Sequence, residues 1–139
     1  MAKVEVMWLS YNKICSMDYT IGYLVSLKFL HLDHNRICRI NATICYCVDL
    51  AGLWIGYNHI KKIPLKLCEA SALSLLDIEH NKVLELPKTV RRRKKLRIIC
   101  HGNFLPSSHH VFEVNMPPTK PQPAPNKVCR SCVDTVDEV

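Results

Sequence analysis

The stretch Leu50-Ala-Gly-Leu-Trp-Ile-Gly-Tyr-Asn-His-Ile60 decides the fold, because the 139-residue chain repeats its pattern. Its centre, Ile55-Gly-Tyr-Asn58, has three counterparts, which are Leu9-Ser-Tyr-Asn12, Leu32-Asp-His-Asn35 and Ile78-Glu-His-Asn81. Successive asparagines in this series are 23 residues apart. So regular a period indicates a repeat architecture, in which similar units stack on one another.

Apolar residues keep fixed places around each asparagine. They stand eight, five and three residues before it and two, five and nine residues after it in all four units. In the first unit these residues are Val4, Met7, Leu9, Ile14, Met17 and Ile21, and in the second they are Leu27, Leu30, Leu32, Ile37, Ile40 and Ile44. No single helix or hairpin has this spacing. Each unit is too small to bury its own apolar side, so stacked units are expected to bury one another's.

Each unit is predicted to contain a short strand, a tight turn at the asparagine and an irregular or helical return. Stacking then places the strands in one parallel sheet. The asparagine amide can hydrogen-bond backbone groups of the turn that no neighbouring strand reaches, which explains a polar residue at an otherwise buried step.

The segment Leu50–Ile60 resembles the leucine-rich repeat, written L-x-x-L-x-L-x-x-N-x-I/L. Its continuation, Lys61-Lys-Ile-Pro-Leu-Lys-Leu67, is similar to the 23-residue intracellular subclass found in Ras-pathway scaffolds and cell-polarity adaptors. The resemblance covers about residues 4 to 105. It implies an α/β leucine-rich-repeat solenoid, a short curved horseshoe segment of four to five repeats with the parallel sheet on its concave face. Residues 1–105 would form this solenoid, and residues 106–139 a proline-rich, disordered tail.

The two ends of the repeat region depart from the pattern. A fifth unit, Arg97-Ile-Ile-Cys-His-Gly-Asn103-Phe-Leu105, arrives after 22 residues and puts Lys95 where an apolar residue is expected, so we interpret it as a degenerate closing repeat. Met1 lies three residues before Val4, which leaves no room for an amino-terminal cap. Because solenoids need polar caps, we expect missing upstream repeats, a shortened product of a longer gene, or self-association through the uncapped edge.

Composition favours a globular chain inside the cell. At 48% hydrophobic residues, the chain has enough apolar material for a core. No run approaches the roughly 18 apolar residues of a membrane span, and the start lacks the charged-then-apolar pattern of a secretory signal. We expect a cytoplasmic protein, with a nuclear location left open. The eight cysteines are expected to stay reduced and to serve as small apolar residues.

The residues between the buried leucines are expected to point outward from the inner side of the sheet. One column reads Trp8, His31, Trp54, Asp77 and Ile99, and another reads Tyr11, His34, Tyr57 and His80. Between them lie Ser10, Asp33, Gly56 and Glu79, with Val6, Phe29 and Leu75 at the sheet's other side. Trp and Tyr often anchor protein interfaces, because they bury a large area at little cost in rotamer entropy. The alternative is that the tryptophans pack on neighbouring strands.

From these columns we predict a face that binds a peptide or a folded protein. Trp8 and Trp54 would be the anchors, and the carboxylates of the face would select a basic partner. The predicted partner-binding residues are Trp8, Tyr11, Phe29, His31, Asp33, His34, Trp54, Tyr57, Asp77, Glu79 and His80.

No catalytic residue, cofactor or metal is expected. His31, His34 and His80 lie near acidic residues, but the repeat period explains their placement without a metal or acid–base site. Cys129 and Cys132 form a lone C-x-x-C, which lacks the second pair of ligands that zinc needs. Cys132-Val-Asp134 resembles the nucleophile motif of bacterial leucine-rich-repeat ubiquitin ligases, whose large helical catalytic domain this chain does not contain.

Two further segments lie outside the predicted face. The basic run Arg91, Arg92, Arg93, Lys94 and Lys95 supplies much of the formal net charge of +7 and is predicted to be solvent exposed. A solvated charge run, a patch for nuclear import or nucleic acid, and a contact with anionic lipid are its three interpretations. The stretch Met116–Pro125 is rich in proline and contains P-x-x-P at Pro118 to Pro121, a weak ligand motif for adaptor domains.

The leading functional hypothesis is a non-enzymatic protein–protein interaction module, acting as a scaffold or adaptor in signal transduction through its concave face. One alternative is the substrate-recognition fragment of a ubiquitin-ligase-type complex, although no recruiting box is visible in the sequence. The other alternative is a basic protein associated with a membrane surface or with nucleic acid.

Overall fold

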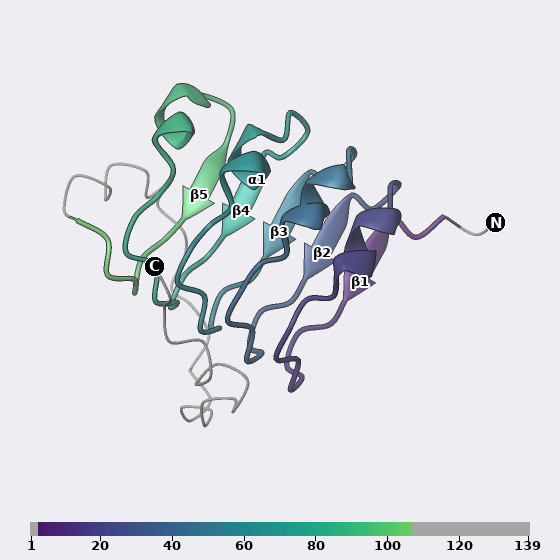
Figure 1. Cartoon of the computed structure of the whole chain (residues 1–139), viewed down its shortest axis with the longest axis horizontal. Helices are drawn as coiled ribbons and strands as arrows, with labels where there is room; N and C mark the ends of the chain where they lie inside the picture. The colour runs from purple at the N-terminus through teal and green to yellow at the C-terminus, as the bar shows by residue number, and fades with distance from the viewer. Residues whose placement is uncertain (1–2, 107–139) are drawn as a thin grey trace.

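The computed structural model describes residues 3–106. The P-x-x-P motif and the Cys129 and Cys132 pair lie outside these described residues. Five strands run parallel to one another in a single sheet, in the order of the sequence (Figure 1). They are β1 (Val6–Trp8), β2 (Phe29–His31), β3 (Gly52–Trp54), β4 (Leu75–Asp77) and β5 (Arg97–Ile99). The predicted parallel-sheet solenoid is therefore confirmed.

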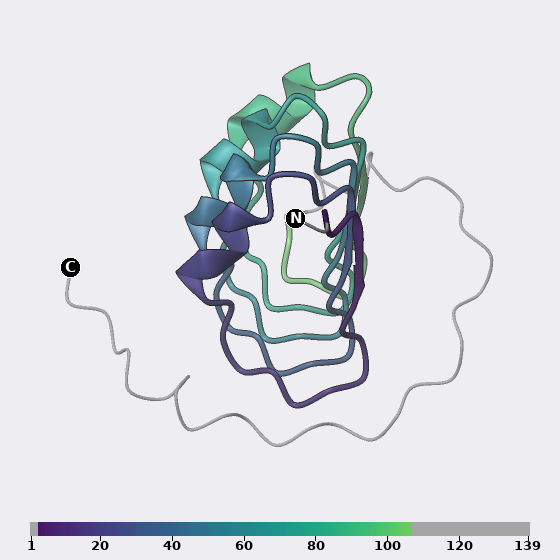
Figure 2. The same cartoon turned by 90° about the vertical axis from the view of Figure 1, so that its right-hand side faces the viewer.

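The returns between strands lie on the side of the solenoid opposite the sheet (Figure 2). They contain three 3₁₀ helices and one α-helix, namely η1 (Tyr19–Tyr23), η2 (Ala42–Tyr46), α1 (Leu65–Glu69) and η3 (Lys88–Arg92). Asp18 and Asn41 begin the first two returns, since their side chains accept hydrogen bonds from the backbone N–H groups of Thr20 and Thr43. Within residues 3–106, no helix has the length and hydrophobicity needed to span a bilayer.

The core lies between the sheet and the returns, as the apolar columns predict. Every column residue of the second, third and fourth units is buried. The column residues of the first unit are less covered, and several of them line an open apolar cavity of about 420 Å³ beside β1. Met7, Leu9, Ile14, Met17 and Ile21 belong to this lining. Self-association through this edge stays a prediction.

The repeated asparagines tie neighbouring units together. The Asn58 amide donates to the carbonyl oxygens of Leu32 at 3.0 Å and Ile55 at 3.1 Å, while its Oδ1 accepts from the backbone N–H of Ile37 at 2.9 Å. Asn35 and Asn81 make the corresponding contacts one unit earlier and one unit later. The predicted role of the asparagine, which is to satisfy turn backbone, is confirmed, and the same side chain also bridges two units.

The fifth strand is placed differently from the sequence prediction. Counting back from Asn103 puts Lys95 at the leading buried position, but Lys95 is exposed and Leu96 is buried instead. Leu96 N–H donates to the Arg93 carbonyl, as Leu73 N–H donates to the Ala70 carbonyl one unit earlier. The pairing of Leu76 with Ile98 then locates the missing residue immediately before β5. The apolar column therefore continues without interruption into this unit.

The cysteines divide into two groups. Cys47 and Cys68 are buried free thiols of the core, in agreement with the prediction that cysteines act as small apolar residues. Burial raises the pKa of the Cys68 thiol to about 11, so it is not a thiolate nucleophile at neutral pH. For Cys38 the prediction of a reduced thiol is wrong, because this residue is disulfide-bonded.

Candidate functional site

The column of Trp8, His31 and Trp54 forms a continuous stack of rings on the exposed face of the sheet. Parallel pairing of β1, β2 and β3 puts the three residues directly beside one another. The ring centroids of Trp8 and His31 are 3.7 Å apart with planes 6° from parallel, and those of His31 and Trp54 are 4.1 Å apart with planes 11° from parallel. Flat side chains at one position of successive strands, about 4.8 Å apart, can close to van der Waals contact.

A second row of rings, Tyr11, His34, Tyr57 and His80, follows the turns at the ends of the strands. Neighbouring centroids are 4.2, 4.2 and 4.5 Å apart, with planes 10° to 19° from parallel. Each residue immediately precedes a repeat asparagine and has a positive φ, between 48° and 58°. This backbone conformation is rare for bulky residues. The turn thus imposes strain at each unit, and the same geometry aligns the rings.

The two tryptophans are covered to different extents. Trp8 is 72% exposed, so one face of its ring is available while the other contacts His31. Trp54 is half-buried because its ring lies over Gly52, where a Cβ would come within 2.6 Å of two ring carbons. Phe29 tilts against the same ring, with centroids 6.3 Å apart. Trp54 therefore packs on neighbouring residues of the sheet, which is the alternative that the sequence left open. Trp8 instead retains a large exposed surface.

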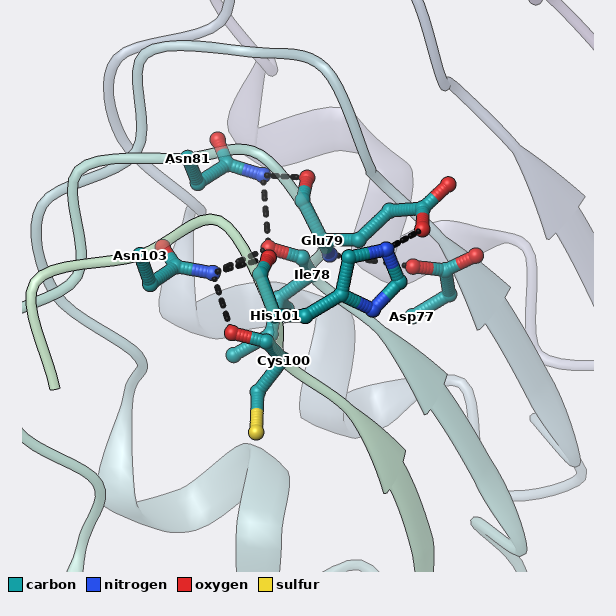
Figure 3. A network of polar contacts seen from close by, with 7 residues as sticks. All are labelled: Asp77, Ile78, Glu79, Asn81, Cys100, His101 and Asn103. Carbon is teal, nitrogen blue, oxygen red and sulfur yellow. Dashed lines mark hydrogen bonds and ion pairs between the residues drawn. The ribbon is translucent and has the colours of Figure 1, made fainter. Parts of the chain in front are cut away.

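Carboxylates lie between and beside the two rows. Asp33 accepts a hydrogen bond from the Ser10 hydroxyl at 2.6 Å. Asp77 Oδ1 accepts from the backbone N–H of Glu79 at 3.0 Å. Glu79 is only 8% exposed, and its Oε2 lies 2.6 Å from Nε2 of His101 (Figure 3). Asp33 and Asp77 are thus partly open to a partner, while Glu79 is held against the fifth unit.

The exposed face is aromatic and acidic although the chain as a whole is basic. Loss of solvation lowers the pKa of His31 and of His34, against the opposing effect of Asp33, so both rings are neutral at pH 7. Burial raises the pKa of Asp77 to about 6, and it is therefore mostly ionised at pH 7. The outward positions of β1 to β4 hold no lysine or arginine; they are Val6, Trp8, Phe29, His31, Gly52, Trp54, Leu75 and Asp77.

The basic run does not form one exposed patch. Arg92, Lys94 and Lys95 are exposed, as predicted. For Arg93 the prediction is wrong, because its half-buried guanidinium donates to backbone carbonyls of the preceding return, with distances of 2.9 Å to Cys68, 2.9 Å to Ala70 and 3.0 Å to Leu73. These carbonyls lie at the end of α1 and in the turn that follows it, so a planar five-donor group can contact several of them at once. Arg93 has a structural role.

Sequence reasoning missed His101 and Gly102. His101 stands in the column of Asp33 and Glu79, and Gly102 stands in the column of His80, each 22 residues after its predecessor. Gly102 has a φ of 69° and no side chain, so the His80 ring occupies the space beside it. His80 and His101 therefore meet edge to face, with centroids 5.2 Å apart. Glu79, His80 and His101 together form a group able to hold a metal ion.

Similar solved structures share this architecture. A leucine-rich-repeat protein of Leptospira interrogans matches with a TM-score of 0.68 and 27% identity, over 73% of this chain and 26% of that chain. An internalin of Listeria monocytogenes matches with a TM-score of 0.62 and 26% identity, over 71% of this chain and 28% of that chain. A structure of the BIR3–SERK2 complex of Arabidopsis thaliana matches with a TM-score of 0.65 and 25% identity, over 76% of this chain and 62% of that chain.

No protein-family model matches the chain, and no curated protein matches it either. The chain spans about a quarter of the length of the two bacterial proteins and 62% of the plant one. These neighbours support a protein-interaction module in general, and the intracellular 23-residue subclass stays a prediction. The 23-residue period, the five parallel strands, the bridging asparagines and these neighbours together show that the chain is a leucine-rich-repeat protein.

Proposed function

We propose that this chain is a non-enzymatic interaction module that binds a basic peptide or basic protein surface through the exposed face of its sheet. The face consists of the two ring rows with Asp33 and Asp77, and we refer to it as the aromatic face. One observation carries the proposal, namely that seven rings are already stacked in two rows across four units before any partner arrives.

Stacked rings suit recognition because they are ordered in advance. An isolated surface tryptophan or tyrosine loses side-chain freedom when a partner immobilises it. Trp8 and Tyr11 are each held on one side by a histidine ring while 72% and 63% of their surface stays exposed. Binding there buries a large area at little further entropic cost.

Charge favours a basic partner. Guanidinium groups stack on aromatic faces and pair with carboxylates. The aromatic face offers both, because the Trp8 ring is largely exposed and Asp33 contacts Ser10 of the same unit as Trp8. The neutral histidines add no repulsion for a cation at pH 7. A scaffold or adaptor role in the cytoplasm follows from the sequence resemblance to the intracellular subclass, and the plant neighbour, solved as a complex, supports partners that are proteins.

The test is recovery of partners from cell lysate by the intact chain and by a Trp8→Ala, Trp54→Ala double variant. The matched control is Tyr23→Ala, Tyr46→Ala, which removes two exposed aromatic residues from the returns. Circular dichroism and thermal melting establish that all three proteins are folded. We expect proteins that the control recovers and the double variant loses. Identical recoveries by the double variant and the intact chain would contradict the proposal.

The alternatives give different results in the same experiment. A basic membrane- or nucleic-acid-binding protein would lose its partners when Arg92, Lys94 and Lys95 are replaced by glutamine, and its binding would weaken steeply with salt. A ubiquitin-ligase substrate receptor would recover ligase subunits through a surface other than the aromatic face. The variants therefore separate the three functions.

A further inference from the structure

We propose that Glu79, His80 and His101 form a binding site for one divalent transition-metal ion, with Zn²⁺ as the expected ion. The site lies at the end of the aromatic face, where the turns after β4 and β5 meet. Figure 3 shows two of its three residues, Glu79 and His101. The sequence predicted no metal, because the histidines it placed together were explained by the repeat period. The three residues of this site come together where the chain departs from that period. His101 and Gly102 follow Glu79 and His80 after 22 residues instead of 23.

The ligand atoms are already near one another. One oxygen of Glu79 and one ring nitrogen each of His80 and His101 all lie within 4.8 Å of one another. In zinc sites each ligand atom lies about 2.0–2.2 Å from the ion, so ligand atoms are at most about 4.4 Å apart. Glu79 Oε2 and His101 Nε2 are 2.6 Å apart and need to separate before both can ligate one ion. Rotation of the partly exposed His101 side chain can provide that separation.

The fold fixes two of the three ligands before the ion binds. Glu79 is 8% exposed, and its Oε2 is sealed from solvent, with the His101 ring nitrogen as its polar contact. The His80 ring fills the space that Gly102 leaves empty and contacts Tyr57 on its other side. His101 is partly exposed, which leaves the ion a route of entry.

Acidic side chains lie close together at this site. Asp77 lies beside the His101 ring in Figure 3 and interacts electrostatically with Glu79 and His101, and Asp33 in turn interacts with Asp77. Among residues 3–106, Glu79 has no ion pair with a lysine or arginine. Asp77 and Glu79 therefore lie close together, and the described residues place only His101 within ion-pair distance of Glu79. A bound divalent ion would supply the missing positive charge.

The chemistry of the ligands selects the class of ion. Two imidazoles and one carboxylate favour zinc or a neighbouring first-row ion over calcium or magnesium, which prefer all-oxygen sites. The sulfur of Cys100 points away from the group in Figure 3, so thiolate is not part of the site. Three protein ligands leave a fourth position open for water or for a donor from a partner.

This inference does not depend on the proposed function. The aromatic face can bind a partner without metal, and the metal site can exist without a partner. The competing occupant of the site is a guanidinium group from a basic partner, which would contact Glu79 and Asp77 but would not need the histidines.

The experiment is calorimetric titration of the full chain with Zn²⁺ without added reductant, so that the disulfide bond of Cys38 is kept. The informative variants are His80→Gln and His101→Gln, and the matched control is His59→Gln, a half-buried histidine outside the group. A Cys129→Ser, Cys132→Ser variant separates this site from any binding by the C-x-x-C pair. Circular dichroism establishes that each variant keeps its fold.

We expect one equivalent of Zn²⁺ to bind, with affinity reduced at least about 10-fold by His80→Gln and by His101→Gln. The control and the double cysteine variant should stay within about twofold of the intact chain. Co²⁺ in place of Zn²⁺ should give ligand-field absorption without a sulfur-to-cobalt charge-transfer band. No binding, binding that survives both histidine variants, or binding lost with the cysteines and accompanied by that band would each overturn the proposal.

Discussion

The imidazole of His34 stacks on the phenol ring of Tyr57, with centroids 4.2 Å apart and planes 10° from parallel, although both residues have a positive φ. Left-handed backbone costs a residue with a Cβ about 1–2 kcal/mol. Ring contacts with Tyr11 on one side and Tyr57 on the other offset this cost at His34. In the second ring row, stacking between the rings therefore compensates for part of the backbone strain of the turns.

Replacement of His34 by glycine is expected to give a more stable protein than replacement by alanine. Both variants lose the ring, but only alanine keeps the left-handed strain, so the difference in the free energy of unfolding should be about 1 kcal/mol. Urea denaturation measures it. At Val48, an exposed residue without a positive φ, glycine should instead be the less stable of the two. Equal stability of the two His34 variants would show that the turn is not strained.

Asn58→Ala is expected to lower the free energy of unfolding by about 3 kcal/mol or more. The substitution leaves the buried Ile37 N–H without this partner, which costs about 1–3 kcal/mol, and the carbonyls of Leu32 and Ile55 each lose one of two asparagine donors, at about 1 kcal/mol each. Hydrogen exchange should become faster at Ile37. The control is Asn12→Ala, an exposed asparagine that bonds only within its own turn and should cost about 1 kcal/mol or less. Equal costs for the two variants would contradict the bridging role.

The period predicts most of the fold and the membership of the aromatic face. A fixed interval of 23 residues puts Trp8, His31 and Trp54 in one column whatever their side chains do, because parallel register follows from the period. The interval does not predict that the rings close into a stack or that Trp54 lies over Gly52. Those features depend on side-chain contacts between units, which a one-dimensional count does not contain.

The group at the fifth unit escaped prediction for a different reason. A single missing residue before β5 shifts every later position, so His101 does not stand out as a member of the Glu79 column. Arg93 was grouped with its basic neighbours because a run of like charges is usually solvated. The carbonyls that it contacts lie 20 to 25 residues earlier in the chain, and only the stacking of returns brings them to Arg93.

Arg93→Gln is expected to destabilise the protein by about 1–3 kcal/mol, because the charged hydrogen bonds to the carbonyls of Cys68, Ala70 and Leu73 are lost. Arg93→Lys should recover only part of the loss, since an ammonium group cannot reproduce the planar fork. The exposed neighbour Arg92 provides the control, and Arg92→Gln should change stability by less than about 0.5 kcal/mol. Thermal or urea unfolding of the three variants measures these values. A similar effect at both arginines would remove the structural role of Arg93.

Self-association through the β1 edge is expected to appear as a molar mass that rises with protein concentration in size-exclusion chromatography with light scattering. The apolar cavity beside β1 provides the contact surface. Met17→Lys places a charge in its lining and should shift the equilibrium toward monomer, whereas Val48→Lys, at an exposed position on a return, should not. A constant monomer mass for the intact chain would exclude this mode of association.

The most direct test of the aromatic face uses the two tryptophans of the chain, Trp8 and Trp54, which both lie on it. Their intrinsic fluorescence therefore reports occupancy of the face without a label. The measurement is acrylamide quenching of the chain alone and saturated with a tryptophan-free fragment of a recovered partner. We expect the partner to protect the tryptophans and to shift their emission, with no shift when Asp33→Asn and Asp77→Asn abolish binding. Unchanged quenching at full saturation would mean that the partner binds elsewhere and would contradict recognition through the aromatic face.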